Sequence, residues 1–232
     1  RAYSQINYVG DETTGFTLTP YIRSTDMQFL QHFLPWQALE ENSHSSVGVK
    51  AQFQKVYGDL TWLSGFDSDY TQGKLTETQA EDFSPAQPAG THYDYDVDAT
   101  VYSPFAHVQW QASQRLMLSV GLRFEHTHYD YNNRLSNGSA CAAGVDNCRF
   151  TRPEDQTVDY DEWSYQTNAN YVITENSRLY AQYSTGYRAP QATELFRLQA
   201  GQTVAELEAE NIDSIGWYMR NEQAIEHIKE NQ

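Results

Sequence analysis

Apolar and polar residues alternate with a period of two along much of the chain, the pattern of a β-strand with one apolar face. The clearest stretch covers residues 116–125, where Leu116, Leu118, Val120, Leu122 and Phe124 alternate with small or charged residues. Similar stretches follow at 163–171 and 179–187. Weaker alternation predicts strands near 2–9, 16–24, 46–55, 60–66 and 97–111, and a last strand that begins near Ile212.

The connections between these strands alternate between short and long. Short turns are expected near 11–14, 57–59, 113–115 and 175–177, and long polar segments near 25–45, 67–96, 130–159 and 189–211. An up-and-down barrel has tight turns at one end and long loops at the other, whereas a Greek-key sandwich has no reason to place every long connection at one end. The sequence therefore predicts an all-β fold, a transmembrane antiparallel up-and-down β-barrel with long extracellular loops, of which about nine strands are present.

The composition is compatible with this fold. Hydrophobic residues make up 39% of the 232 residues, and the mean hydropathy is −0.71. There is no apolar stretch near the roughly 20 residues of a spanning helix, but a barrel strand needs only alternate apolar residues over about 9–11 positions. Aromatic residues reach 14%, with 17 tyrosines, as in barrels that place aromatic girdles at both lipid interfaces. Outer-membrane lipid is therefore an expected partner.

The formal net charge of −16 argues against nucleic acid as a partner, because phosphate binding requires lysine and arginine. We expect the acidic surplus to be ordinary solvated loop surface. Sequence motifs give no sign of a catalytic group, a cofactor or a metal site, so an enzyme is not expected. His126 and His128 share a strand face, but no third metal ligand is evident near them.

The two cysteines, Cys141 and Cys148, lie in one short polar segment that contains a glycine. This spacing favours a local disulfide, formed on a route through the oxidising periplasm. The chain begins inside a strand-like pattern, so we expect a piece of a longer protein. We expect a partial barrel over residues 1–220 and a polar tail, helical or disordered, over 221–232.

Three stretches between residues 101 and 220 carry a family resemblance. They are Val-Tyr-Ser-Pro-Phe-Ala-His-Val-Gln-Trp at 101–110, the run ending Gly-Leu-Arg-Phe-Glu at 121–125, and Ser-Thr-Gly-Tyr-Arg-Ala-Pro at 184–190. Glu-Leu-Phe at 194–196 and Leu-Glu-Ala-Glu-Asn at 207–211 follow in the expected order. Together they resemble the barrel of TonB-dependent outer-membrane receptors.

The resemblance implies an energy-coupled importer in the outer membrane of a Gram-negative cell. In this family a barrel of about 22 strands encloses an N-terminal plug, and extracellular loops bind a ferric siderophore or a similar large nutrient. The TonB complex would act through the plug region, which is absent from this chain. Two alternatives remain open: a passive porin or adhesin barrel, and a soluble β-sandwich binding module.

Six residues are candidates for ligand binding. Arg188 ends a strand and faces the lumen on the alternation, where it either contacts an anionic ferric complex or, more commonly, pairs with carboxylates of the wall or plug. The other candidates are aromatic and arginine side chains of expected loops, which form either a ligand platform or ordinary loop surface. They are Trp36, Tyr131, Arg134, Arg149 and Arg152.

Overall fold

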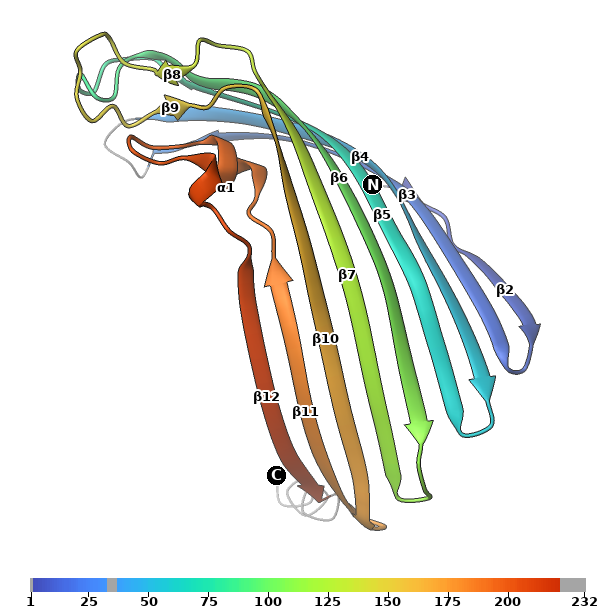
Figure 1. Cartoon of the computed structure of the whole chain (residues 1–232). Coiled ribbons are helices and arrows are strands. Elements are labelled where there is room, and N and C mark those ends of the chain that lie inside the picture. Colours follow the sequence, from blue (N-terminus) through green and yellow to red (C-terminus); the bar gives the residue numbers. More distant parts are fainter. Residues whose placement is uncertain (1, 33–36, 222–232) are drawn as a thin grey trace, which may run out of the picture.

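The computed structural model describes residues 2–32 and 37–221, and they form one curved antiparallel sheet of ten strands (Figure 1). The strands are β1 (Ala2–Tyr3), β2 (Ile6–Asp11), β3 (Thr14–Leu30), β4 (Ala38–Tyr57), β5 (Leu60–Gln79), β6 (Gly90–Gln111), β7 (Leu116–Asn133), β10 (Gln156–Thr174), β11 (Ser177–Arg188) and β12 (Glu210–Asn221). From β3 onward each strand pairs with the next long strand along the chain, while β1 and β2 both pair with β3. The predicted all-β, up-and-down fold is confirmed as a partial barrel that is not closed.

The connections sort to the two ends of the sheet, as predicted. One end, here called the turn end, carries the tight connections β2–β3, β4–β5, β6–β7 and β10–β11 (Figure 1). The opposite loop end carries the segments 31–37, 80–89, 134–155 and 189–209. Short elements lie in the last two segments. They are β8 (Gly138–Ser139), β9 (Thr151–Arg152), the helix α1 (Ala192–Phe196) and the 3₁₀ turn Val204–Glu206.

Several strands are longer than the alternation predicted. The segments 25–45 and 67–96, expected to be loops, are mostly strand, because β3 reaches Leu30 and β5 reaches Gln79. Near the loop end both faces of these strands carry polar residues, as in Thr-Gln-Gly-Lys at 71–74. Hydrophobic alternation is then invisible although the strand pairing continues.

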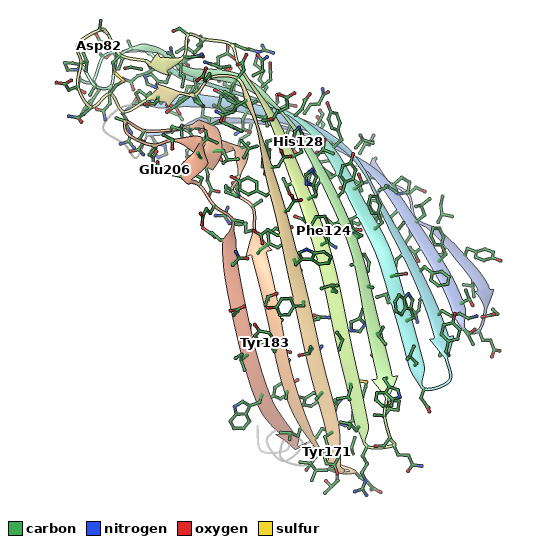
Figure 2. The ribbon with its side chains drawn as sticks, viewed as in Figure 1. Asp82, Phe124, His128, Tyr171, Tyr183 and Glu206 are labelled. Carbon is green, nitrogen blue, oxygen red and sulfur yellow. A yellow bond between two sulfur atoms is a disulfide. The ribbon has the colours of Figure 1, made fainter. Side chains whose placement is uncertain are left out.

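The two faces of the sheet differ in chemistry. We call the face that carries the segment 189–209 the inner face, and the opposite face the outer face. The outer face bears a continuous band of apolar side chains near the turn end and middle of the sheet, well exposed in this chain (Figure 2). The band includes Ile22, Val47, Phe53, Trp62, Phe66, Tyr102, Trp110, Val120, Leu122, Trp163, Tyr165, Tyr171, Ile215 and Trp217. Alternate residues on strands therefore produce one wide apolar surface.

The inner face at the same level is polar and internally paired. Arg123 contacts Asp67 at 3.1 Å, and Ser103 donates a hydrogen bond of 2.8 Å to Glu125. Thr71 donates to Asp69 at 2.6 Å. A polar inner face opposite an apolar outer band is the arrangement of a barrel wall with an aqueous or protein-filled interior.

The compact hydrophobic core lies at the loop end, on the inner face. It consists of side chains from β5, β6, β7 and the two longest loop segments, which are Leu75, Tyr93, Tyr95, Val97, Tyr131, Cys148, Phe150, Leu195, Phe196, Leu198 and Val204. In the described residues no helix is long and apolar enough to span a bilayer.

Candidate functional site

The segment 189–209 folds back over the inner face and covers part of the loop end. Figure 1 shows α1 tucked against this concave side of the sheet. Leu195 and Phe196 are fully buried there, and the Phe196 ring stacks on Tyr131 of β7 with centroids 4.2 Å apart. Burying a leucine and a phenylalanine contributes about 1.5–3 kcal/mol each, so the segment is a packed element of the wall and not a free loop.

Three tyrosines from three neighbouring strands donate hydrogen bonds to backbone carbonyls of this segment. The Tyr93 hydroxyl on β6 lies 2.7 Å from the carbonyl oxygen of Leu198. Two further hydroxyls, of Tyr129 on β7 and Tyr160 on β10, reach the carbonyls of Pro190 at 3.0 Å and of Leu207 at 2.9 Å. Carbonyls of an irregular segment need such donors when water is excluded.

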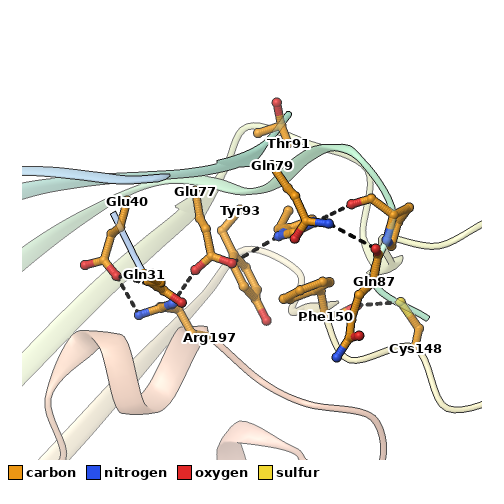
Figure 3. A network of polar contacts seen from close by, with 12 residues as sticks. Gln31, Glu40, Glu77, Gln79, Gln87, Thr91, Tyr93, Cys148, Phe150 and Arg197 are labelled. Atoms are coloured by element: carbon orange, nitrogen blue, oxygen red, sulfur yellow. Dashed lines mark hydrogen bonds and ion pairs between the residues drawn. The ribbon is translucent and has the colours of Figure 1, made fainter. Parts of the chain in front are cut away.

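A buried ion network fixes the middle of the segment (Figure 3). Arg197 forms ion pairs with Glu40 of β4, at 2.9 Å, and with Glu77 of β5. The Glu77 side chain is 1% exposed, and its other oxygen lies 3.0 Å from Nδ1 of the equally buried His92. The His92 Nε2 lies 2.8 Å from the carbonyl oxygen of Pro88, so both ring nitrogens face an oxygen.

The network changes the acidity of its members. Burial raises the pKa of Glu77, but the hydrogen bond with His92 and the positive charge of Arg197 outweigh burial and hold this pKa below its ordinary value. For Arg197, burial opposes the charge, but Glu77 and Glu40 raise its pKa. The carboxylate and the guanidinium are therefore both charged at neutral pH, and their attraction is strengthened by the low local dielectric.

Arg188 joins three elements near the same place. Its guanidinium pairs with Glu194 of α1 at 2.8 Å and with Glu210 of β12 at 3.0 Å. All three side chains are substantially exposed. The hydrogen bond from Arg188 lowers the pKa of Glu194. Carboxylates of this chain thus occupy two sides of the Arg188 guanidinium. This arrangement is the one expected if Arg188 pairs with carboxylates of the wall.

The four candidates from the expected loop 130–159 do not form one exposed platform. β7 continues to Asn133, so the alternation places Tyr131 on the inner face, where it is 1% exposed beneath Phe196. Arg134 pairs with Asp96 at the surface. Arg152 donates to the carbonyls of His92 and Thr91, each at 2.7 Å, and so ties β9 to β6.

β8 and β9 pair within the segment 134–155, which is here called the 134–155 hairpin. Arg149 lies half-buried within it, and its backbone N–H donates to the carbonyl of Ala86 at 3.1 Å. The Cys141 and Cys148 sulfurs are 2.02 Å apart, which closes the tip of the hairpin, and Cys148 is buried. Trp36 lies outside the described residues, as do residues 222–232 of the expected tail.

The exposed side of the segment 189–209 was missed by the sequence reasoning. It presents amide, hydroxyl and carboxylate groups at the mouth of the sheet, which belong to Gln199, Gln202, Thr203, Glu206 and Glu208. The sequence held two signals of order: the apolar Leu-Phe-Arg-Leu run at 195–198, and the Thr203–Glu206 spacing of a capping box.

An amphipathic up-and-down sheet, with tight turns at one end and packed loops over its inner face at the other, defines the class of the protein: it is a section of the wall of a large β-barrel. The family described as "TonB dependent receptor-like, beta-barrel" matches residues 1–216. The chain therefore belongs to the TonB-dependent receptors. No protein of the curated set matches the chain.

Solved structures of similar fold are about three times longer than this chain. The unliganded ferric citrate transporter FecA has a TM-score of 0.69 at 14% identity, and the match covers 94% of this chain and 31% of FecA. The copper transporter OprC has a TM-score of 0.67 at 14% identity, and the match covers 94% of this chain and 36% of OprC. The ferric yersiniabactin uptake receptor FyuA from Yersinia pestis has a TM-score of 0.64 at 16% identity, and the match covers 94% of this chain and 32% of FyuA. At these identities the likeness establishes the fold.

Proposed function

We propose that this chain forms part of the barrel of an outer-membrane receptor that imports a ferric siderophore through TonB-coupled transport. The observation that carries the proposal is the match of residues 1–216 to the receptor barrel family, on a wall with an apolar outer band and a polar inner face. The outer band then contacts outer-membrane lipid, and the loop end lies outside the cell.

In this proposal the ligand enters over the segment 189–209. The segment is fixed by buried Phe196, by the three tyrosine hydroxyls and by Arg197, so its exposed glutamines and carboxylates form a stable side of the mouth. Arg188 serves to hold α1 and β12 together. Arg134, Arg149 and Arg152 remain the candidates from the 134–155 hairpin for contact with an anionic chelate.

A transport assay in a strain without other TonB-dependent receptors tests the ligand class. Cells that express the full-length receptor should accumulate radiolabelled iron from a ferric siderophore, and accumulation should stop when the TonB complex is inactivated. Replacing Arg134, Arg149 and Arg152 together by glutamine should lower chelate affinity, because one desolvated arginine–carboxylate contact is worth on the order of 2–5 kcal/mol.

Two other results would change the proposal. Unchanged affinity in the triple variant would remove the hairpin from the binding surface and leave the transport function intact. Uptake of copper without any uptake of iron would overturn the siderophore assignment, and the structural likeness to a copper transporter makes that arm of the experiment necessary.

A further inference from the structure

The strands β10 and β11 separate before they reach the loop end. Their pairing extends from the turn end only to Gln166 of β10 and Ser184 of β11, whereas β10 stays paired with β7 as far as Gln156. Figure 1 shows β10 continuing toward the loop end beyond the end of β11. Over the same stretch β11 keeps β12 as its partner, up to Arg188. The sheet is therefore split between two of its long strands.

The split leaves one edge of β10 without hydrogen-bond partners. The Val172 N–H donates to the carbonyl of Arg115, so the main-chain groups of even-numbered residues of β10 point to β7 and those of odd-numbered residues point to β11. At the start of the split, the Tyr165 N–H donates to the Thr185 hydroxyl at 3.0 Å instead of to a carbonyl of β11. Beyond Tyr165, the odd-numbered main-chain groups find no hydrogen-bond partner among the residues that the structure describes. This stretch, here called the free edge, consists of Thr157, Asp159, Asp161 and Trp163.

The free edge is exposed and carries negative charge on the outer face. The Asp159 and Asp161 side chains are 51% and 63% exposed. Each is oriented by a histidine of β7, since Asp159 Oδ1 lies 2.6 Å from Nδ1 of His128 and Asp161 Oδ1 lies 2.7 Å from Nδ1 of His126. Within the described part of the chain, neither carboxylate forms an ion pair with a lysine or an arginine. Two oriented carboxylates therefore lie two residues apart along the free edge.

The inner side of the split is also open. A hollow of 460 Å³ lies where the two strands separate, and its lining includes Ser164 of β10 and Gly186 and Tyr187 of β11. The segment 189–209 contacts the inner face of β10 through the Tyr160 hydroxyl, which donates to the carbonyl of Leu207 at 2.9 Å, but it does not pair with the free edge. An added strand would therefore find space beside β10.

An occupant of this edge has to supply donors and acceptors together, at the spacing of a β-strand. A lipid phosphate only accepts hydrogen bonds and would leave the carbonyls of the edge unpaired, whereas an extended peptide supplies both groups. A second copy of this chain fits less well, because pairing of two free edges would bring like-charged aspartates together, and such cross-strand pairs are destabilising. Charge complementarity favours a different chain with positive side chains.

We propose that the free edge of β10 docks an extended segment of a partner polypeptide, which adds a strand to the sheet and carries lysine or arginine beside Asp159 and Asp161. Main-chain hydrogen bonds supply the binding, and the cross-strand charge pairs supply the preference for a basic sequence. Both aspartates lie beyond the apolar band, toward the loop end. The partner therefore approaches through water, where an unpaired strand edge is tolerated, and not through lipid.

The test uses a fluorescein-labelled heptapeptide, Thr-Lys-Val-Lys-Val-Lys-Thr, and the full-length receptor in detergent. Fluorescence anisotropy should show saturable binding, and amide hydrogen exchange of residues 156–165 should become slower when the peptide is bound. The same peptide with every amide N-methylated cannot donate main-chain hydrogen bonds, and should bind at least roughly tenfold more weakly. A peptide with glutamate in place of each lysine should also bind more weakly, because it repels the two aspartates.

Asp159→Pro and Asp159→Ala are matched variants of the receptor. Both remove the carboxylate and its contact with His128, but only proline also removes the N–H that points into the split. Proline is tolerated in a strand where its N–H would face solvent, so pairing of β10 with β7 should persist. The alanine variant should bind the lysine peptide more weakly than the wild type, and the proline variant roughly tenfold more weakly than the alanine variant.

The proposal is overturned if the lysine peptide and its N-methylated form bind equally, or if the proline and alanine variants bind equally. The peptide comparison uses the unaltered receptor, so it decides the matter even if the proline variant does not fold. Equal binding of the lysine and glutamate peptides would overturn the basic partner. Lipopolysaccharide that slows hydrogen exchange of residues 156–165 as strongly as the peptide would assign the edge to lipid, and receptor dimers lost in Asp159→Pro would assign it to a second copy. Iron-chelate uptake should stay unchanged in both Asp159 variants, so this result is independent of the transport function.

Discussion

The ring of Tyr21 on β3 lies against Gly48 on β4, in the space that any side chain at position 48 would occupy. The Tyr21 hydroxyl then crosses β4 and donates a hydrogen bond to Asp69 on β5. One aromatic side chain thus spans three strands on the inner face. In the same way, the Phe105 ring on β6 occupies the space that a side chain at Gly65 on β5 would need.

Gly48→Ala should therefore destabilise the barrel although alanine is small. A Cβ at position 48 would overlap the Tyr21 ring and lie 2.7 Å from the carbonyl oxygen of Ser68. Displacing the ring breaks its bond to Asp69, and overpacking of this kind costs about 1–3 kcal/mol. The free energy of unfolding of the full-length protein in urea and detergent measures the effect. Gly73→Ala is the control, because its Cβ would meet only Val97 O at an ordinary 3.6 Å, and equal losses would contradict the account.

The outward orientation of β10 gives a second prediction. Ala169 pairs with Leu118 within the apolar outer band, whereas Asn168 faces inward and its side-chain amide donates to Ser119 Oγ at 3.0 Å. Ala169→Arg should cost roughly 2–4 kcal/mol in the membrane if position 169 lies near the bilayer midplane, because a charge then faces lipid. Asn168→Arg should cost clearly less. Folding equilibria of the full-length receptor in lipid vesicles measure both, and similar costs would contradict the assignment of faces.

Arg197 should be the most sensitive single position of the segment 189–209. Its removal leaves two carboxylates, Glu40 at 9% and Glu77 at 1% exposure, without their cation. Breaking a buried pair in this way costs about 3–5 kcal/mol, and we expect the lower value for Arg197→Gln because Arg197 is itself 25% exposed. The readout is amide hydrogen exchange of the segment 189–209, which should become faster.

Arg134→Gln provides the comparison for that experiment. Arg134 and its partner Asp96 are 44% and 36% exposed, and surface pairs contribute only about 0–1 kcal/mol. Hydrogen exchange of the segment should therefore stay slow in this variant. Fast hydrogen exchange of the segment in the wild type would show that the segment is not held by Arg197 at all.

Acid should release the same segment. Because the pKa of Glu77 is lowered by folding, its carboxylate stabilises the native state above the ordinary value near 4.5, and this contribution is lost as the pH falls below that value. Hydrogen exchange of the segment 189–209, corrected for the intrinsic exchange rate at each pH, should accelerate between pH 6 and pH 3 in the wild type. In Glu77→Gln the segment should exchange faster at neutral pH and show a smaller acceleration in acid, and an unchanged pH response would assign the effect to another carboxylate.

The strand order and the faces of the sheet were predictable because hydrophobic alternation and turn length are local signals. From 116 to 125 and from 163 to 171 every second residue indicates the apolar outer face directly. The strand ends were not predictable where both faces are polar. Tyr131 was assigned to a loop for this reason, although the strand that starts at Leu116 continues to Asn133.

The loop-end site depends on long-range contacts that no local pattern contains. Arg197 meets Glu40 across 157 residues and Glu77 across 120. The sequence showed Arg188 and its downstream glutamates, but not that Glu194 and Glu210 share one guanidinium. His126 and His128 were visible as a pair, while Asp159 and Asp161 became their neighbours only through the pairing of β7 with β10.

The last prediction concerns Cys141 and Cys148, whose Cα atoms are 5.8 Å apart at the tip of the 134–155 hairpin. A disulfide that closes so short a segment contributes no more than about 2–3 kcal/mol, chiefly by restricting the unfolded chain. Replacing both cysteines by serine should therefore leave barrel assembly intact and raise only the protease sensitivity of the hairpin. Reduction of the wild type by dithiothreitol should give the same sensitivity, which serves as the control for the substitutions themselves. Because Cys148 is buried next to Phe150 and the hairpin packs on the loop-end core, slightly faster hydrogen exchange of the segment 189–209 should accompany the change. If both thiols react with an alkylating reagent in unreduced, surface-exposed receptor, the disulfide does not exist in the cell and the hairpin is held by packing and Arg152 alone.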